Sequence, residues 1–247
     1  MKKNTESSPG LNHSFVCVIP VYNNAGTIFQ VVERVQRFTR HILLIDDGST
    51  DVDLAKHYRN SDVEVIRHPK NLGKGAALRT ALNILQKRQI CYMLTLDADG
   101  QHYPEDIPLF YDVIRKSNCT LAVGCRDFQQ PNVPLKSKKG RSFSNYWIAR
   151  ETGLDIEDTQ SGFRLYPVAP LASLNYIAKR YNFETEILTK AAWQGIPICN
   201  IAVRTFYPPA SERVSHFRLF RDNILIAAMH LYLLFLKIRF GKEVKNK

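Results

Sequence analysis

The sequence has few cysteines and no paired arrangement of them. Its five cysteines form no CxxC pair and share no repeated spacing, which argues against a zinc site and against a disulfide framework. We therefore expect reduced thiols in a cytosolic protein. The N-terminal segment 1–13 lacks the apolar stretch of a secretion signal, so we expect a flexible lead-in there.

Long apolar runs are absent as well. The longest uncharged stretch near the C-terminus, 223–236, is shorter than the roughly 20 apolar residues that span a bilayer. Asn223, His230 and Lys237 recur every seven residues and would form a narrow polar stripe on an apolar helix. We expect residues 211–247 to form a basic, amphipathic unit at a membrane interface. A helix packed on the domain, or a contact within a homo-oligomer, is the alternative.

Acidic residues are outnumbered by basic ones. The chain has 23 Asp and Glu against 34 Lys and Arg, and basic residues gather in "KSKKGR" (136–141), which we interpret as a loop, and after residue 236. No helix-turn-helix, zinc-finger or RNP pattern accompanies this charge, so we expect no nucleic-acid partner. Anionic lipid and small phosphorylated ligands are the partners that such charge favours.

A regular alternation of strand-like and helix-like segments is present. Apolar, β-branched runs occur within 15–20, 41–50, 62–68, 91–100 and 119–126. Apolar residues at helical spacing separate them, and the first strands end in polar clusters. This pattern predicts an α/β, doubly wound, mostly parallel sheet in a domain spanning 14–210. We expect the less regular second half of the chain to form the part of the binding site that holds the second substrate.

Two acids in "LTLDADGQ" follow the fourth predicted strand. Residues two apart in an extended segment point the same way, so Asp97 and Asp99 could face one divalent cation, with Gln101 continuing the alternation. Mg²⁺ and Mn²⁺ prefer such oxygen ligands and share them with substrate phosphates. The alternative is a turn whose acids cap the helix that starts at Pro104.

Other strand ends carry residues suited to a nucleotide. Asp46 and Asp47 could accept hydrogen bonds from a base or a ribose, and Tyr22 could stack on a base; capping and plain packing are the alternatives. "NLGKGAAL" fails the GxxxxGK[ST] spacing, so Gly73 more simply allows a close backbone approach. Lys74 either reaches a ligand or is solvated.

Seven ordered motifs together resemble a known family: "VIPVYNNAGTI", "LLIDDGSTD", "NLGKGAALRTAL", "LDADGQHYPEDI", "VGCR", "DTQSGFRLY" and "FETEIL". Over residues 15–205 the chain is similar to GT-A family 2 glycosyltransferases, specifically the dolichyl/polyprenyl-phosphate mannose (or glucose) synthase branch. The resemblance implies a GT-A fold, a nucleotide-diphosphate sugar donor, a divalent cation and inversion at the anomeric carbon.

The resemblance also implies roles for individual residues. Donor-binding positions are Pro20, Tyr22, Asn23, Asp46, Asp47, Gly73, Lys74, Asp97 and Ala98. Metal ligands are Asp97, Asp99 and Gln101. Acceptor-phosphate positions are Arg126, Arg141, Asn145, Ser161 and Arg164, and Arg204 and Arg213 are candidates for the diphosphate. Asn145 stands where a serine is usual, and Asn24 where a glutamate is usual. The stretch 211–222 also departs from the best-known synthases, which leaves the acceptor open.

The acceptor decides the mechanism. A phosphate acceptor is already anionic and needs only orientation by Arg126 and Arg141, whereas a hydroxyl acceptor needs a general base, for which Asp158 is the candidate. We expect a lipid-phosphate acceptor at the inner face of the cytoplasmic membrane. Transfer to a hydroxyl of a glycolipid or envelope glycan, a nucleotidyltransferase, and a catalytically silent sugar-nucleotide-binding scaffold are the alternatives.

Overall fold

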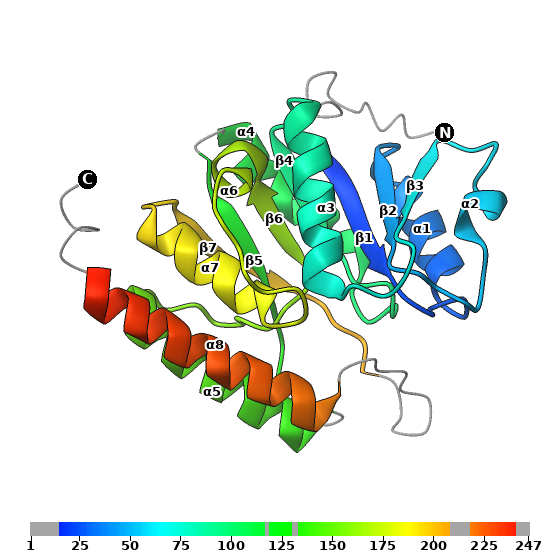
Figure 1. Ribbon diagram of the computed structural model, residues 1–247. Helices are drawn as coiled ribbons and strands as arrows, with labels where there is room; N and C mark the ends of the chain where they lie inside the picture. The colour runs from blue at the N-terminus through cyan, green and yellow to red at the C-terminus, as the bar shows by residue number, and fades with distance from the viewer. Residues whose placement is uncertain (1–14, 117–118, 130–132, 208–217, 241–247) are drawn as a thin grey trace.

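The computed structural model describes residues 15–116, 119–129, 133–207 and 218–240, and is built on one seven-stranded sheet flanked by helices (Figure 1). The strands are β1 (Phe15–Val21), β2 (Ile42–Asp46), β3 (Val63–Arg67), β4 (Tyr92–Thr95), β5 (Leu121–Arg126), β6 (Arg164–Pro167) and β7 (Ile198–Val203). Their order is β3-β2-β1-β4-β6-β5-β7. All pairings are parallel except those of β6, so the predicted mostly parallel α/β sheet is confirmed.

Two apolar cores cover the two faces of this sheet. One face packs against α3 (Lys74–Lys87), α5 (Leu135–Thr152), α6 (Val168–Ala172), α7 (Phe183–Trp193) and α8 (Leu219–Phe240). The other packs against α1 (Ile28–Gln36), the 3₁₀ helix η1 (Pro104–Phe110) and α4 (Tyr111–Lys116), with α2 (Leu54–His57) nearby. The strands read as continuous apolar runs because both of their faces are buried.

The antiparallel strand β6 brings a distant motif to the ligand-binding edge. Its first residue, Arg164, is in register with Thr95 at the end of β4 and with Val123 of β5. The segment "DTQSGF" that leads into β6 therefore lies where the parallel strands end. The Thr95 hydroxyl donates a 2.8 Å hydrogen bond to the Gly162 carbonyl, which fixes this segment beside the chain that carries Asp97.

The helix α5 corrects one expectation. The basic segment "KSKKGR", interpreted above as a loop, forms the first turns of this helix after Pro134. Apolar periodicity does not reveal α5, because its inward side carries the fully buried Ser144 and Glu151 while Phe143 and Tyr146 are exposed. Its basic residues are thus held on a rigid element beside the sheet edge.

The helix α8 lies alongside α5 (Figure 1) and turns its polar stripe toward it. His230 is buried, with Nδ1 2.8 Å from Glu151 Oε1 and Nε2 3.3 Å from Ser144 Oγ. Thr189 of α7 donates to the same glutamate at 3.0 Å. On this side, α8 is therefore packed on the domain, as the alternative to a membrane-interface helix expects.

The opposite side of α8 is apolar and exposed. Ile224, Leu231, Phe235 and Ile238 follow one another at helical spacing there, with Leu231 63% and Ile238 77% exposed. Within the described ranges, no helix has the length and apolar character needed to cross a bilayer.

Candidate active site

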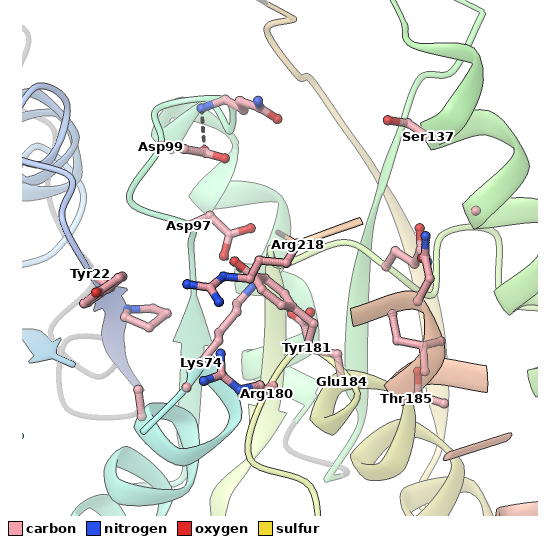
Figure 2. A pocket seen from close by; sticks show the side chains of 18 of the residues that line it. Tyr22, Lys74, Asp97, Asp99, Ser137, Arg180, Tyr181, Glu184, Thr185 and Arg218 are labelled. Carbon is pink, nitrogen blue, oxygen red and sulfur yellow. Dashed lines mark hydrogen bonds and ion pairs between the residues drawn. The ribbon is translucent and has the colours of Figure 1, made fainter. Parts of the chain in front are cut away.

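A cavity of about 1450 Å³ opens at the ends of the parallel strands and extends to the α5–α8 pair. Ten of the residues predicted from the sequence line it: Pro20, Tyr22, Asp47, Gly73, Lys74, Asp97, Ala98, Asp99, Gln101 and Arg126. Its far side is formed by residues of α5, α7 and α8. Figure 2 shows Tyr22 facing Lys74 and Asp97 across the cavity.

The Asp97 carboxylate is the electrostatic centre of the cavity. Lys74 Nζ lies 2.6 Å from its Oδ1, and His102 Nε2 lies 3.8 Å from its Oδ2. Burial would raise the pKa of Asp97, but the Lys74 charge and the neighbouring His102 lower it well below its usual range. Asp97 is therefore held as the anion.

Asp99 is in the opposite electrostatic situation. Burial first, and then the neighbouring Asp97 charge, raise the pKa of its carboxyl group above the usual 3.8. Its Oδ1 accepts the backbone N–H of Gln101 at 3.0 Å, as the dashed line in Figure 2 marks. The two carboxylates lie on one wall of the cavity and repel one another. A bound cation would relieve this repulsion.

The residues on this wall fit a divalent cation by their chemistry. Asp97, Asp99 and Gln101 supply hard oxygen donors that Mg²⁺ and Mn²⁺ prefer. In the part of the chain that the structure describes, no three His, Cys, Asp or Glu side chains gather into a ready-made cation site. A cation here would depend on substrate oxygens for the rest of its coordination.

Lys74 is placed by the loop before α3, which Asp47 holds. Asp47 accepts the backbone N–H groups of Leu72 and Gly73 at 2.9 and 2.7 Å, and its Oδ1 lies 2.7 Å from His68 Nδ1. Gly73 has a φ of +103°, a conformation that side chains rarely adopt. Asp47 thus shapes the loop in addition to lining the cavity.

The Lys74 ammonium bridges two carboxylates, because Glu184 Oε1 of α7 lies 3.0 Å from its Nζ. Burial would lower the pKa of Lys74, but the charges of Asp97 and Glu184 outweigh it and raise the pKa. Of the two interpretations of Lys74 made from the sequence, solvation is therefore excluded. Glu184 lies in the "FETEIL" motif but was not among the predicted site residues.

Gly162 makes room for Asp97. A Cβ at this position would overlap Asp97 Oδ2 and lie 2.5 Å from its Cγ. The glycine of "DTQSGF" is therefore required by the close approach of two segments that are distant in sequence. No local pattern in the sequence marks this glycine, because only the register of β6 against β4 brings it close to Asp97.

Two predicted donor residues lie behind the cavity wall. Asp46 is fully buried, accepts the Ser49 N–H at 2.7 Å, and pairs through Oδ2 with Arg67 Nε at 3.5 Å. Asn23 accepts the Thr50 N–H at 2.8 Å and so joins the loops after β1 and β2. Both residues support the pocket from outside its lining.

Arg126, which lines the cavity, forms a bidentate pair with Asp158. Arg126 donates from Nε at 2.6 Å and from Nη2 at 2.9 Å to the two carboxylate oxygens, and Asp158 is fully buried. The guanidinium groups of Arg126 and Arg141 lie 5.0 and 4.1 Å from the Phe128 ring centroid. Arg141 Nε is buried without a partner among the described residues.

Three predicted acceptor residues are occupied by structural contacts outside the cavity lining. The Asn145 amide holds the turn before Thr159 through bonds to Glu157 O and to the Thr159 N–H and hydroxyl. Ser161 is buried and accepts the Phe163 N–H at 3.3 Å. The fully buried Arg164 donates to the carbonyls of Ser161, Glu184 and Thr159.

Of the two predicted diphosphate arginines, Arg204 does not join this site. Arg204 is paired with Asp106 through Nε and Nη2 at 2.8 and 2.6 Å, and does not line the cavity. Arg213 lies outside the described residues. The cavity is instead lined by Arg180 and Arg218, which the sequence analysis did not single out.

A mostly parallel sheet with an Asp-x-Asp pair and a bridging lysine at its strand ends defines a glycosyltransferase of the GT-A fold. The chain belongs to glycosyl transferase family 2, whose model matches residues 16–226. The resemblance stated from the motifs is thereby confirmed.

Named relatives agree with this assignment. The UDP-N-acetylglucosamine–dolichyl-phosphate N-acetylglucosaminyltransferase of Methanococcus voltae is 27% identical over 248 residues, covering 91% of this chain and 96% of that protein. The polyprenol monophosphomannose synthase of Mycolicibacterium smegmatis is 27% identical, with 75% of each chain covered. The structure of mannosyl-3-phosphoglycerate synthase from Rubrobacter xylanophilus shares the fold, with a TM-score of 0.66 at 16% identity over 94% of this chain and 76% of that one.

Proposed function

We propose that this glycosyltransferase is metal-dependent and inverting, and moves a sugar from a GDP- or UDP-sugar to a polyprenyl phosphate or related lipid at the cytoplasmic face of a membrane. The observation that carries the proposal is the single cavity that connects the Asp97–Lys74 end to the α5–α8 pair. The named relatives that act on dolichyl phosphate or make polyprenol monophosphomannose support the choice of acceptor.

The donor end follows from the charges. Asp97, Asp99 and Gln101 would hold Mg²⁺ or Mn²⁺, which would neutralise charge on the departing diphosphate. Lys74 keeps Asp97 ionised and oriented, and Tyr22 offers its ring to the base on the opposite wall.

The reaction is a single displacement. An oxygen of the acceptor phosphate bonds to the anomeric carbon while the bond from that carbon to the donor diphosphate breaks, and the electron pair leaves with the diphosphate. No proton has to be removed from a phosphate acceptor, so Arg126 and Arg141 need only bind and orient it.

The state of Asp158 favours this acceptor over a hydroxyl. A general base must reach the proton that it removes, within about 3 Å of it. Both oxygens of Asp158 accept bonds from Arg126, and the carboxylate is fully buried. Asp158 is therefore better suited to hold Arg126 toward a phosphate than to deprotonate a hydroxyl.

A transfer assay tests the proposal. The purified chain would be mixed with UDP- or GDP-sugars, Mn²⁺, and either a polyprenyl phosphate or the matching polyprenol. We expect transfer to the phosphate alone, loss of transfer in Asp97→Ala and Asp99→Ala, and partial activity in Asp158→Asn. Transfer to the polyprenol with a severe defect in Asp158→Asn would contradict a phosphate acceptor. Full activity in the presence of a chelator would contradict the metal.

A further inference from the structure

We propose that Arg180 and Arg218 bind the diphosphate of the donor and hold it as it leaves. This inference rests on the proposed nucleotide-diphosphate donor, and adds two residues that the family motifs do not point to.

Two of the arginines that the sequence suggested are held in structural contacts outside the cavity lining. Arg164 is paired with three backbone carbonyls and Arg204 with Asp106. In contrast, no residue within the described ranges accepts a hydrogen bond from, or forms an ion pair with, the guanidinium group of Arg180 or Arg218. Both line the cavity, and Figure 2 shows them among the side chains around Lys74 and Asp97.

Arg180 is fixed at its backbone. Its carbonyl accepts the Phe183 N–H at 3.1 Å at the start of α7, and the Ala76 N–H of α3 donates to Lys179 O at 2.9 Å. A Cβ on Gly75 would lie 2.8 Å from Arg180 O, so the two segments approach closely only because position 75 is glycine. This contact sets Arg180 beside the helix that carries Lys74.

Arg218 is fixed from the other side of the cavity. It precedes α8, and its backbone N–H donates at 2.7 Å to Oδ2 of Asp222, a side chain that is itself buried. Its position therefore depends on how α8 packs against α5 and α7. In Figure 2 its side chain reaches back toward Asp97 and Tyr181.

The charge at this end of the cavity requires further cations once a donor is bound. Asp97, Asp99 and Glu184 are opposed by one lysine, and a divalent cation would bring the group only to neutrality. A nucleotide sugar adds two negative charges from its diphosphate, and more charge develops as the bond to the sugar breaks. Two guanidinium groups match this charge, and their planar fork suits phosphate oxygens.

In Figure 2 Arg180 and Arg218 lie beside Lys74 and Asp97, whereas Arg126 and Arg141 both approach the Phe128 ring. We therefore assign Arg180 and Arg218 to the donor diphosphate and leave Arg126 and Arg141 to the acceptor phosphate.

Binding measurements on Arg180→Gln and Arg218→Gln test the assignment without relying on turnover. Calorimetric titration with UDP, GDP, UMP and GMP in the presence of Mn²⁺ would give each affinity. We expect each variant to bind the diphosphate about 10-fold more weakly, as for a lost hydrogen bond to a charged group, with a much smaller change for the monophosphate. Arg37→Gln is the matched control, because it removes the same charge from an exposed arginine at the C-terminal end of α1.

The outcomes separate the inference from the proposed function. If the unmodified chain bound neither UDP nor GDP, the nucleotide-diphosphate donor itself would be wrong. If it bound one of them and both variants bound it equally well, the donor would stand and the role of Arg180 and Arg218 would be refuted. A raised KM for polyprenyl phosphate with unchanged diphosphate affinity would also refute it, by moving the pair to the acceptor.

Discussion

Gly162 sets the position of Asp97 and gives a sharp test at the scale of one residue. In Gly162→Ala the new methyl group would occupy the space of the Asp97 carboxylate, which must rotate away from the cation and donor. We expect the fold to persist and the transfer rate to fall by about 100-fold, because misplacement of a reacting group by an ångström has that effect. Gly26→Ala is the control, since a Cβ there meets nothing within 4 Å. Equal rates in the two variants would contradict the crowding.

Asp99 gives the site a pH dependence of known sign. A raised pKa means that Asp99 takes up a proton at a higher pH than an ordinary aspartate, and a proton competes with Mn²⁺ for the carboxylate. Affinity for Mn²⁺ should therefore rise with pH through that raised pKa and then level off. Titrations that start at about pH 4, near the ordinary aspartate value, and continue upward would follow it. Asp99→Asn should bind Mn²⁺ weakly, with the pH dependence reduced; a wild-type curve flat over this range would contradict the shift.

The site shows how far residue-level prediction reaches. Strand-end acids such as Asp47 and Asp97 were placed correctly in the cavity, because parallel strands end at one edge of a sheet. The partners of arginines were not predictable, since Arg164 and Arg204 find theirs on segments that only the fold brings close. Arg180 and Arg218 carried no local signal that set them apart from other basic residues.

At the scale of elements, the contact between α5 and α8 contains a buried polar cluster. It consists of His230, Glu151 and Ser144. His230→Ala would leave the Glu151 carboxylate buried without this partner. We expect the free energy of unfolding to fall by about 2–3 kcal/mol, measured by urea denaturation.

A surface pair provides the comparison for His230. Glu33 and Arg37 are 72% and 61% exposed, and Glu33→Gln should change the unfolding free energy by less than about 0.5 kcal/mol. If His230→Ala altered stability as little as this variant, the polar contact would not hold α8 in place.

The exposed apolar side of α8 predicts how the chain meets a membrane. Leu231→Asp with Ile238→Asp should reduce sedimentation with anionic vesicles several-fold, because charged groups oppose burial in the interface. Neither residue lines the cavity, so nucleotide binding should not change. Leu109→Asp on η1, against the other face of the sheet, is the matched control at 48% exposure. Equal sedimentation of all three proteins would contradict docking through this side.

The same two helices mark the limit of pattern-based prediction for elements. The helix α3 was predicted from its buried apolar side, which the structure confirms. The helix α5 was missed because its polar side is buried and its apolar side exposed. The polar stripe of α8, which recurs every seven residues, was recognised from the sequence. Its partner was not, because a sequence does not tell whether the stripe faces water or a buried glutamate.

For the whole molecule, the excess of basic residues predicts a salt-dependent partner. A net charge of +11 attracts anionic lipid, and salt screens this attraction over about 10 Å at 0.1 M. Binding to anionic vesicles should weaken between low and high NaCl concentration while the apolar contribution of α8 persists. Sedimentation with anionic and neutral vesicles across a salt series would measure it. Identical binding to both lipids at every concentration would contradict a role for the charge.

The antiparallel strand β6 also determines when the protein can finish folding. It fills the gap between β4 and β5, and it follows both of them in the chain. A ribosome that has released only the first 160 residues therefore exposes a β4 with one open edge, a template for pairing with other chains. The N-terminal half is not an autonomous unit in this sense. Completion must wait for residues 164–167, and long-range pairing of this kind makes folding slow and exposed to aggregation.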